Sequence, residues 1–90
     1  MNKVNDPFLY GCPILDLHGE TYETSKVLTK IFIDDAVKTG DKKLVIIHGK
    51  GMGIVKEAVN SELKTNKYVE NYKIDNFNDG MTIVILKDKR

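Results

Sequence analysis

The sequence predicts an α/β fold of the α+β type: a two-layer sandwich with a four-stranded mixed sheet and both helices on one face. Three observations support this class. Short apolar runs and longer segments with apolar residues at helical spacing alternate in the order β-α-β-α-β-β. The first two strands are joined by a helical crossover, so they should be parallel and the crossover right-handed. Two crossovers of the same hand put both helices on one face of the sheet. The last two strands flank the hairpin dipeptide Asp79-Gly80 and should be antiparallel.

Composition and charge indicate a small globular domain. The chain has 90 residues, of which 41% are hydrophobic and 30% charged, which suits one folded domain and not a disordered segment. The net charge of +1 does not by itself indicate nucleic-acid binding. Cys12 is the sole cysteine, which excludes an intramolecular disulfide, and no apolar stretch has the length of a membrane span or a signal peptide. We therefore expect a cytoplasmic protein with no membrane partner.

Residues 1–13 are predicted to form an N-terminal arm ahead of a domain at residues 14–90. Turn-forming residues in the arm surround the apolar cluster Phe8-Leu9-Tyr10. We expect this cluster to pack over a helix, near Ile33 and Val37.

The segment "PILDL" (13–17) has the alternation of a strand. Leu15 and Leu17 should point to one face of the sheet. The remaining side chains of this stretch should point to the other face: Ile14, Asp16 and His18.

A helix is predicted from Thr21 to about Lys38. Thr21 is a suitable N-cap, and Gly40 is a suitable C-cap residue. The apolar stripe that should face the core comprises Val27, Leu28, Ile31, Phe32 and Ala36.

The rest of the chain alternates in the same way. The run "KLVIIHG" (43–49) is almost wholly apolar, which is typical of a central strand. A second helix is predicted at 53–65, followed by strands at 67–74 and 81–87. The apolar side of the second helix should comprise Ile54, Val55, Ala58, Val59 and Leu63.

Both parallel strands end in His-Gly. Because the carboxyl ends of parallel strands lie at one edge of a sheet, His18 and His48 should lie at the same edge. If the two strands are neighbours, about 4.8 Å apart, both imidazoles should open onto one pocket. Asp16 shares a face with His18, and a carboxylate that orients an imidazole is a general acid/base arrangement. A structural Asp16 that accepts N–H bonds from a neighbouring turn is an equal alternative.

The loop "HGKGMG" (48–53) has the residues of a phosphate site. Glycines let the backbone approach an anion closely, N–H groups at a helix start point towards it, and Lys50 adds a positive charge. The spacing matches neither a Rossmann fingerprint nor a Walker A loop, so a plain flexible turn stays open as an alternative. The sequence has no spacing signature of a zinc site, and we expect no metal and no cofactor.

From Ile14 to Lys87 the chain resembles the small MutS-related (Smr) domain family, through "LDLHG" at 15–19, "HGKGMGIVKEAV" at 48–59 and the closing "GMTIVIL". The resemblance implies the two-layer fold described above. Family members occur alone or as the C-terminal domain of MutS-like proteins that act on recombination intermediates or stalled ribosomes, and several are endonucleases. This chain departs from the family pattern in its hairpin loop "NFNDG", which has fewer glycines.

The resemblance implies a nucleic-acid-binding domain that cleaves or nicks RNA or DNA, with the ribosome or repair and recombination proteins as possible partners. The alternative is a non-catalytic RNA- or DNA-binding module that acts with a partner protein. Asp16 and His18 are the predicted catalytic residues. The predicted phosphate-binding residues are Gly19, His48, Gly49, Lys50, Gly51, Met52 and Gly53.

Overall fold

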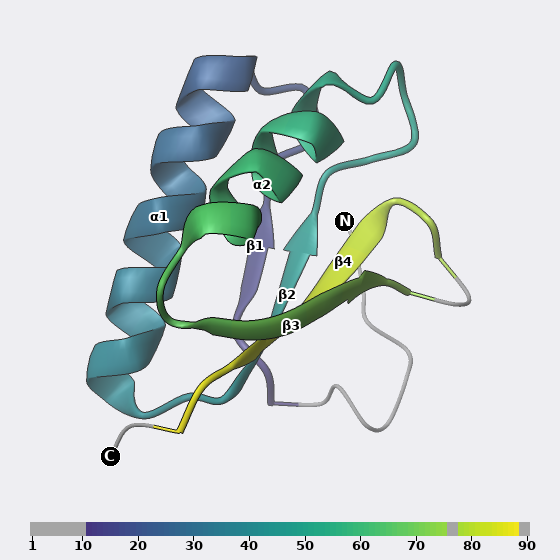
Figure 1. Ribbon diagram of the computed structural model, residues 1–90. Helices are drawn as coiled ribbons and strands as arrows, with labels where there is room; N and C mark the ends of the chain where they lie inside the picture. The colour runs from purple at the N-terminus through teal and green to yellow at the C-terminus, as the bar shows by residue number, and fades with distance from the viewer. Residues whose placement is uncertain (1–10, 76–77, 89–90) are drawn as a thin grey trace.

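The computed structural model describes residues 11–75 and 78–88 and contains the expected six elements in the expected order (Figure 1). The elements are β1 (Ile14–Asp16), α1 (Tyr22–Thr39), β2 (Lys43–Ile47), α2 (Ile54–Thr65), β3 (Val69–Ile74) and β4 (Met81–Leu86). The N-terminal arm at residues 1–10, including the predicted packing of Phe8-Leu9-Tyr10, lies outside the described residues.

The four strands form one mixed sheet in the order β1-β2-β4-β3. β1 and β2 are parallel neighbours, with Asp16 opposite Ile47. β2 lies between β1 and β4, which agrees with its apolar sequence, and β3 and β4 form the predicted antiparallel hairpin. The carboxyl ends of β1 and β2 therefore lie side by side.

Both helices cover the same face of the sheet, as predicted (Figure 1). The larger hydrophobic core joins α1 and α2 to the strands beneath them. Its buried members are Leu17, Ile33, Ala36, Leu44, Ile46, Val55, Val59, Leu63, Val84 and Leu86. The opposite face of the sheet has a smaller cluster of Val45, Ile47, Met81 and Ile83, against which Cys12 and Ile85 pack.

The predicted caps of α1 are confirmed, but its predicted core stripe is wrong in part. The Thr21 hydroxyl accepts the backbone N–H of Thr24 at 3.1 Å, and Gly40 has the left-handed φ of 80°. Val27 and Ile31, by contrast, are exposed, with relative accessibilities of 57% and 49%.

The reason is helical phase. At about 100° per residue, Val27 lies roughly 200° around the helix from Ser25. Ser25 and Thr29 occupy part of the buried face, so a stripe chosen by apolarity alone was displaced towards Val27 and Ile31. The other predicted members do meet the core, since Ala36 is buried and Leu28 and Phe32 pack against it partly buried. The buried residues of α1 are Ser25, Thr29, Ile33 and Ala36.

The predicted apolar face of α2 is correct except at its first residue. Val55, Ala58, Val59 and Leu63 are buried, whereas Ile54 is 51% exposed. None of the helices at residues 11–75 and 78–88 is long and apolar enough to cross a membrane.

Candidate functional site

The first strand-to-helix turn continues the pairing of β1 with β2. The Leu17 N–H donates to the Ile47 carbonyl at 2.7 Å, and the Glu20 N–H donates to the Leu17 carbonyl at 3.0 Å. Leu17 is buried in the core between the sheet and the helices. His18, the next residue, lies in the turn that follows β1, on the molecular surface.

Asp16 and His18 form a directly bonded pair. His18 Nδ1 lies 2.7 Å from Asp16 Oδ1, and the same oxygen accepts the backbone N–H of His18 at 3.2 Å. A carboxylate can only accept a hydrogen bond, so Nδ1 carries the ring proton and donates a hydrogen bond to Asp16. The His18 side chain is 69% exposed, which leaves Nε2 as the ring nitrogen that a substrate can reach. The expected contact between the Asp16 carboxylate and the His18 ring is thus present.

His48 has a different environment, because its ring is buried between the second turn and β4. Its Nδ1 lies 3.1 Å from the Gly49 carbonyl, and its Nε2 lies 2.9 Å from the Thr82 hydroxyl. Since a carbonyl only accepts, Nδ1 donates, and the neutral ring then accepts the Thr82 O–H at Nε2. Burial lowers the pKa of His48; the Gly49 carbonyl and Asp79 oppose this shift, and the charge of Lys56 adds to it. Both ring nitrogens are therefore engaged within the protein.

The expectation that the two imidazoles open onto one pocket is wrong. The turns themselves do meet, since a Cβ placed on Gly49 would lie 3.4 Å from the Cβ of His18. Only the His18 ring is exposed, because Thr82 and the Gly49 carbonyl hold His48 inside the molecule. The His48 side chain supports the loop from within and does not face an external phosphate.

The β3–β4 hairpin contributes two residues that sequence reasoning missed. The Gly80 carbonyl accepts the N–H groups of both His48 and Gly49, at 2.8 and 3.0 Å, so the Gly49 amide is not available to a phosphate. A Cβ on Gly80 would lie 3.2 Å from the Gly49 carbonyl carbon and from Lys50 Cγ, which is tighter than most Cβ contacts, so glycine suits this close approach of the hairpin. The other residue is Thr82, whose hydroxyl in an otherwise apolar strand was the available signal.

The rest of the glycine loop lies at the start of α2. Gly53 is the N-cap, with φ of 86°, and it provides no side-chain cap for the first N–H groups of the helix. Lys50 is exposed, and its ammonium lies 3.5 Å from Asp79 Oδ1. Met52, at the loop tip, is 93% exposed. The loop therefore presents a helix N-terminus and a lysine to solvent, which suits an anion.

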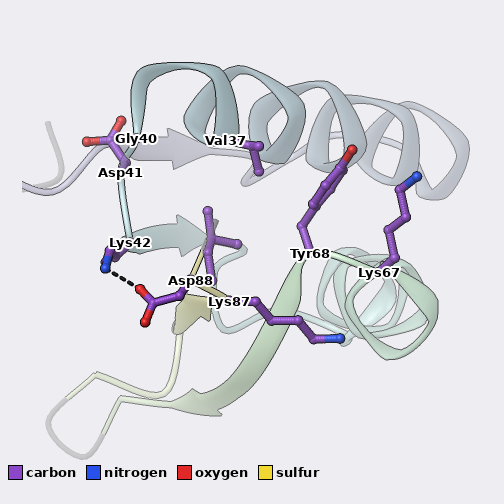
Figure 2. Close-up of a pocket in the computed structure, with 9 residues that line it drawn as sticks. Val37, Gly40, Asp41, Lys42, Lys67, Tyr68, Lys87 and Asp88 are labelled. Carbon is purple, nitrogen blue, oxygen red and sulfur yellow. Dashed lines mark hydrogen bonds and ion pairs between the residues drawn. The ribbon is translucent and has the colours of Figure 1, made fainter. Parts of the chain in front are cut away.

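No group of three or more His, Cys, Asp or Glu side chains within residues 11–75 and 78–88 is arranged to hold a metal ion. A cavity of about 360 Å³ lies at the opposite end of the sheet, where α1 ends and β2 begins (Figure 2). Val37, Tyr68 and Leu86 form part of its apolar lining, and an ion pair between Lys42 and Asp88 lies at its edge. This cavity includes no residue of the two His-Gly turns.

Comparisons with known proteins agree with the fold described above. A family model described as the Smr domain matches residues 15–87. The chain is 38% identical over 76 residues to endonuclease MutS2 of Clostridium acetobutylicum and 42% identical over 76 residues to endonuclease MutS2 of a Geobacillus species, strain WCH70. Each match covers 81% of this chain and 10% of the relative, so the chain spans about a tenth of the length of these proteins.

Two solved structures share the fold. The Smr domain of Thermus thermophilus MutS2 matches with a TM-score of 0.80 and 27% identity, covering 83% of this chain and 98% of that one. YdaL, a stand-alone small MutS-related protein from Escherichia coli, matches with a TM-score of 0.78 and 26% identity, covering 83% of this chain and 64% of that one.

Proposed function

Because this chain belongs to the Smr domain family, we propose that it binds nucleic acid and cleaves it as an endonuclease. The observation that carries the proposal is the state of His18. One ring nitrogen is bound to Asp16, and the other is available on the surface beside the glycine loop. The relatives named endonuclease MutS2 support a nuclease, although this chain matches only a tenth of their length.

The chemistry assigned to His18 is proton transfer at Nε2, with Asp16 as the group that orients the ring. On RNA, Nε2 accepts the proton of a 2′-hydroxyl, whose oxygen attacks the adjacent phosphorus. A bond forms between that oxygen and phosphorus, the bond to the 5′-oxygen breaks, and the leaving oxygen takes a proton from solvent. On DNA, which lacks this hydroxyl, an activated water has to be the nucleophile.

The substrate phosphate is assigned to the surface formed by the glycine loop and the start of α2. The N–H groups at the start of α2 have no side-chain cap from Gly53, and the helix dipole favours an anion there. Lys50 and Lys56 supply positive charge; Lys56 is close enough to influence the buried His48. Gly49 is excluded as an amide donor because its N–H is bonded to Gly80.

A second candidate is a binding module without catalysis, which acts with a partner from repair, recombination or translation. The exposure of His18 favours this alternative. A general base that stays 69% exposed works in water, where electrostatic stabilisation of a transition state is weaker than in an enclosed site. The same loop and lysines would then hold RNA or DNA, and binding would show a steep salt dependence without strand scission.

One assay separates the two candidates. End-labelled single-stranded and branched RNA and DNA are incubated with the parent protein, His18→Ala and Asp16→Asn, each with and without a chelator. Loss of the general base should slow cleavage by about 10²- to 10⁴-fold while leaving most binding. RNA with a single 2′-deoxy substitution at the cleaved position tests the hydroxyl route.

Lys38→Ala is the matched control, since Lys38 is exposed at the far end of α1. It should cut like the parent. If His18→Ala also cuts at the parental rate, the role assigned to His18 is wrong. If no purified form cuts any substrate but all bind, the protein is a binding module.

A further inference from the structure

We propose that Met52 and Ile54 form an apolar tip that contacts a nucleobase next to the phosphate held by the glycine loop. This inference rests on the proposed function, because it assumes that the loop meets a nucleic-acid backbone. It adds which part of the substrate the loop tip contacts and through which residues.

The exposure of these two side chains is the starting observation. Met52 is 93% exposed and Ile54 is 51% exposed. Ile54 is the first residue of α2, and its side chain lies outside the core because Val55 and Ala58 hold the buried face of the helix. The loop thus carries two solvated apolar side chains one residue apart, on either side of the N-cap Gly53.

The chemistry of methionine excludes a side-chain role in phosphate binding. A thioether has no charge and no hydrogen-bond donor, so it cannot neutralise a phosphate. Its flexible, polarisable side chain does pack well against flat rings. Apolar side chains such as Met and Ile also act as wedges at base steps in several nucleic-acid-binding proteins. In a nucleic acid, each phosphate is linked through a sugar to a base, and the flat faces of that base are the nearest apolar surface.

The position of the tip favours a base over a protein partner. Met52 lies in the same short loop as Lys50, next to the N-terminus of α2. A nucleic-acid phosphate bound there would therefore bring its attached nucleoside close to Met52. Stable protein interfaces bury about 1,200 Å² or more in total, well beyond what two side chains supply. Because bases in an intact duplex are stacked, the contacted base should be unpaired or unstacked.

The test pairs a change in the protein with a change in the substrate. Affinity is measured for the parent and Met52→Ser with a labelled single-stranded oligonucleotide, and with versions in which one position at a time is abasic. For the parent, removing the contacted base should weaken binding by about fivefold or more, the lower end of one base contact. Met52→Ser should bind the intact strand more weakly than the parent. It should also lose less than the parent does when that base is removed, because only Ile54 of the tip remains to contact the base.

Salt dependence provides an independent readout. Met52→Ser should leave the slope of log affinity against log salt unchanged, whereas Lys50→Gln should reduce it by about one. Val27→Ser is the matched control, because Val27 is 57% exposed on the outer side of α1, and it should behave like the parent with every strand.

The two levels of the proposal fail in different ways. If the parent binds no oligonucleotide, the proposed function is wrong. If the parent binds, but Met52→Ser loses as much as the parent when the base is removed, the apolar tip does not contact a base. The same conclusion follows if Met52→Ser binds the intact strand as tightly as the parent.

Discussion

Replacing Thr82 by valine should destabilise the fold from a position that no substrate touches. Valine has nearly the shape of threonine, and Thr82 is fully buried, so the substitution exchanges the hydroxyl for a methyl group of similar size. That hydroxyl lies 2.9 Å from His48 Nε2 and is the donor to the neutral ring. In the variant, Nε2 remains buried as an acceptor without its partner.

The expected cost follows from this geometry. A buried polar group left without its hydrogen bond costs about 1–3 kcal/mol. For a domain of this size, each kcal/mol lowers the midpoint of thermal unfolding by about 4–8 °C. The free energy of unfolding of a small domain is only about 5–15 kcal/mol, so a loss of this size is a measurable fraction of the total.

Urea unfolding at neutral pH, followed by circular dichroism, gives the difference in unfolding free energy. Thr29→Val is the matched control, because Thr29 is equally buried and its hydroxyl donates to the Ser25 carbonyl. In the variant that carbonyl still accepts the backbone N–H of residue 29, as in any α-helix, so no buried group loses its only partner. Loss of the Thr29 hydroxyl should therefore lower the free energy of unfolding by less than about 1 kcal/mol. If Thr82→Val costs no more than Thr29→Val, the hydrogen bond to His48 does not stabilise this end of the sheet.

Three further predictions concern the same region. Burial holds the pKa of His48 in the folded state below its usual 6.5. The neutral, buried ring therefore stabilises the fold fully above pH 6.5, and this stabilisation is lost as the pH falls below 6.5. The urea concentration at the unfolding midpoint, measured against pH, should fall in this range for the parent but not for His48→Gln. Asp79→Asn removes the carboxylate 3.5 Å from the Lys50 ammonium and should strengthen oligonucleotide binding about two- to fivefold at low salt, measured by fluorescence anisotropy; an equal gain at high salt would contradict the electrostatic cause. Gly80→Ala places a Cβ 3.2 Å from the backbone of Gly49 and should destabilise the fold by about 1–3 kcal/mol, and an unchanged melting temperature would refute this contact.

Sequence reasoning succeeded where the rule is local. The capping side chain of Thr21 and the left-handed Gly40 bound α1 as expected, because caps depend on residues within one turn. It failed for the core side of α1, where Val27 and Ile31 are apolar but exposed. Periodicity gives the spacing of a stripe, but only the packing partner decides which stripe is buried when two are possible.

The tertiary structure made β1 and β2 neighbours and so brought the two His-Gly turns into contact. The sequence by itself determined the order of the six elements, the parallel direction of β1 and β2, and the placing of both His-Gly turns at one edge of the sheet. These follow from periodicity, turn residues and the handedness of crossovers, which act over short stretches of chain. Only the tertiary structure decided that His18 is exposed and His48 is buried. The difference comes from Gly80 and Thr82, because the hairpin folds back and brings a hydroxyl to His48 from 34 positions away along the chain.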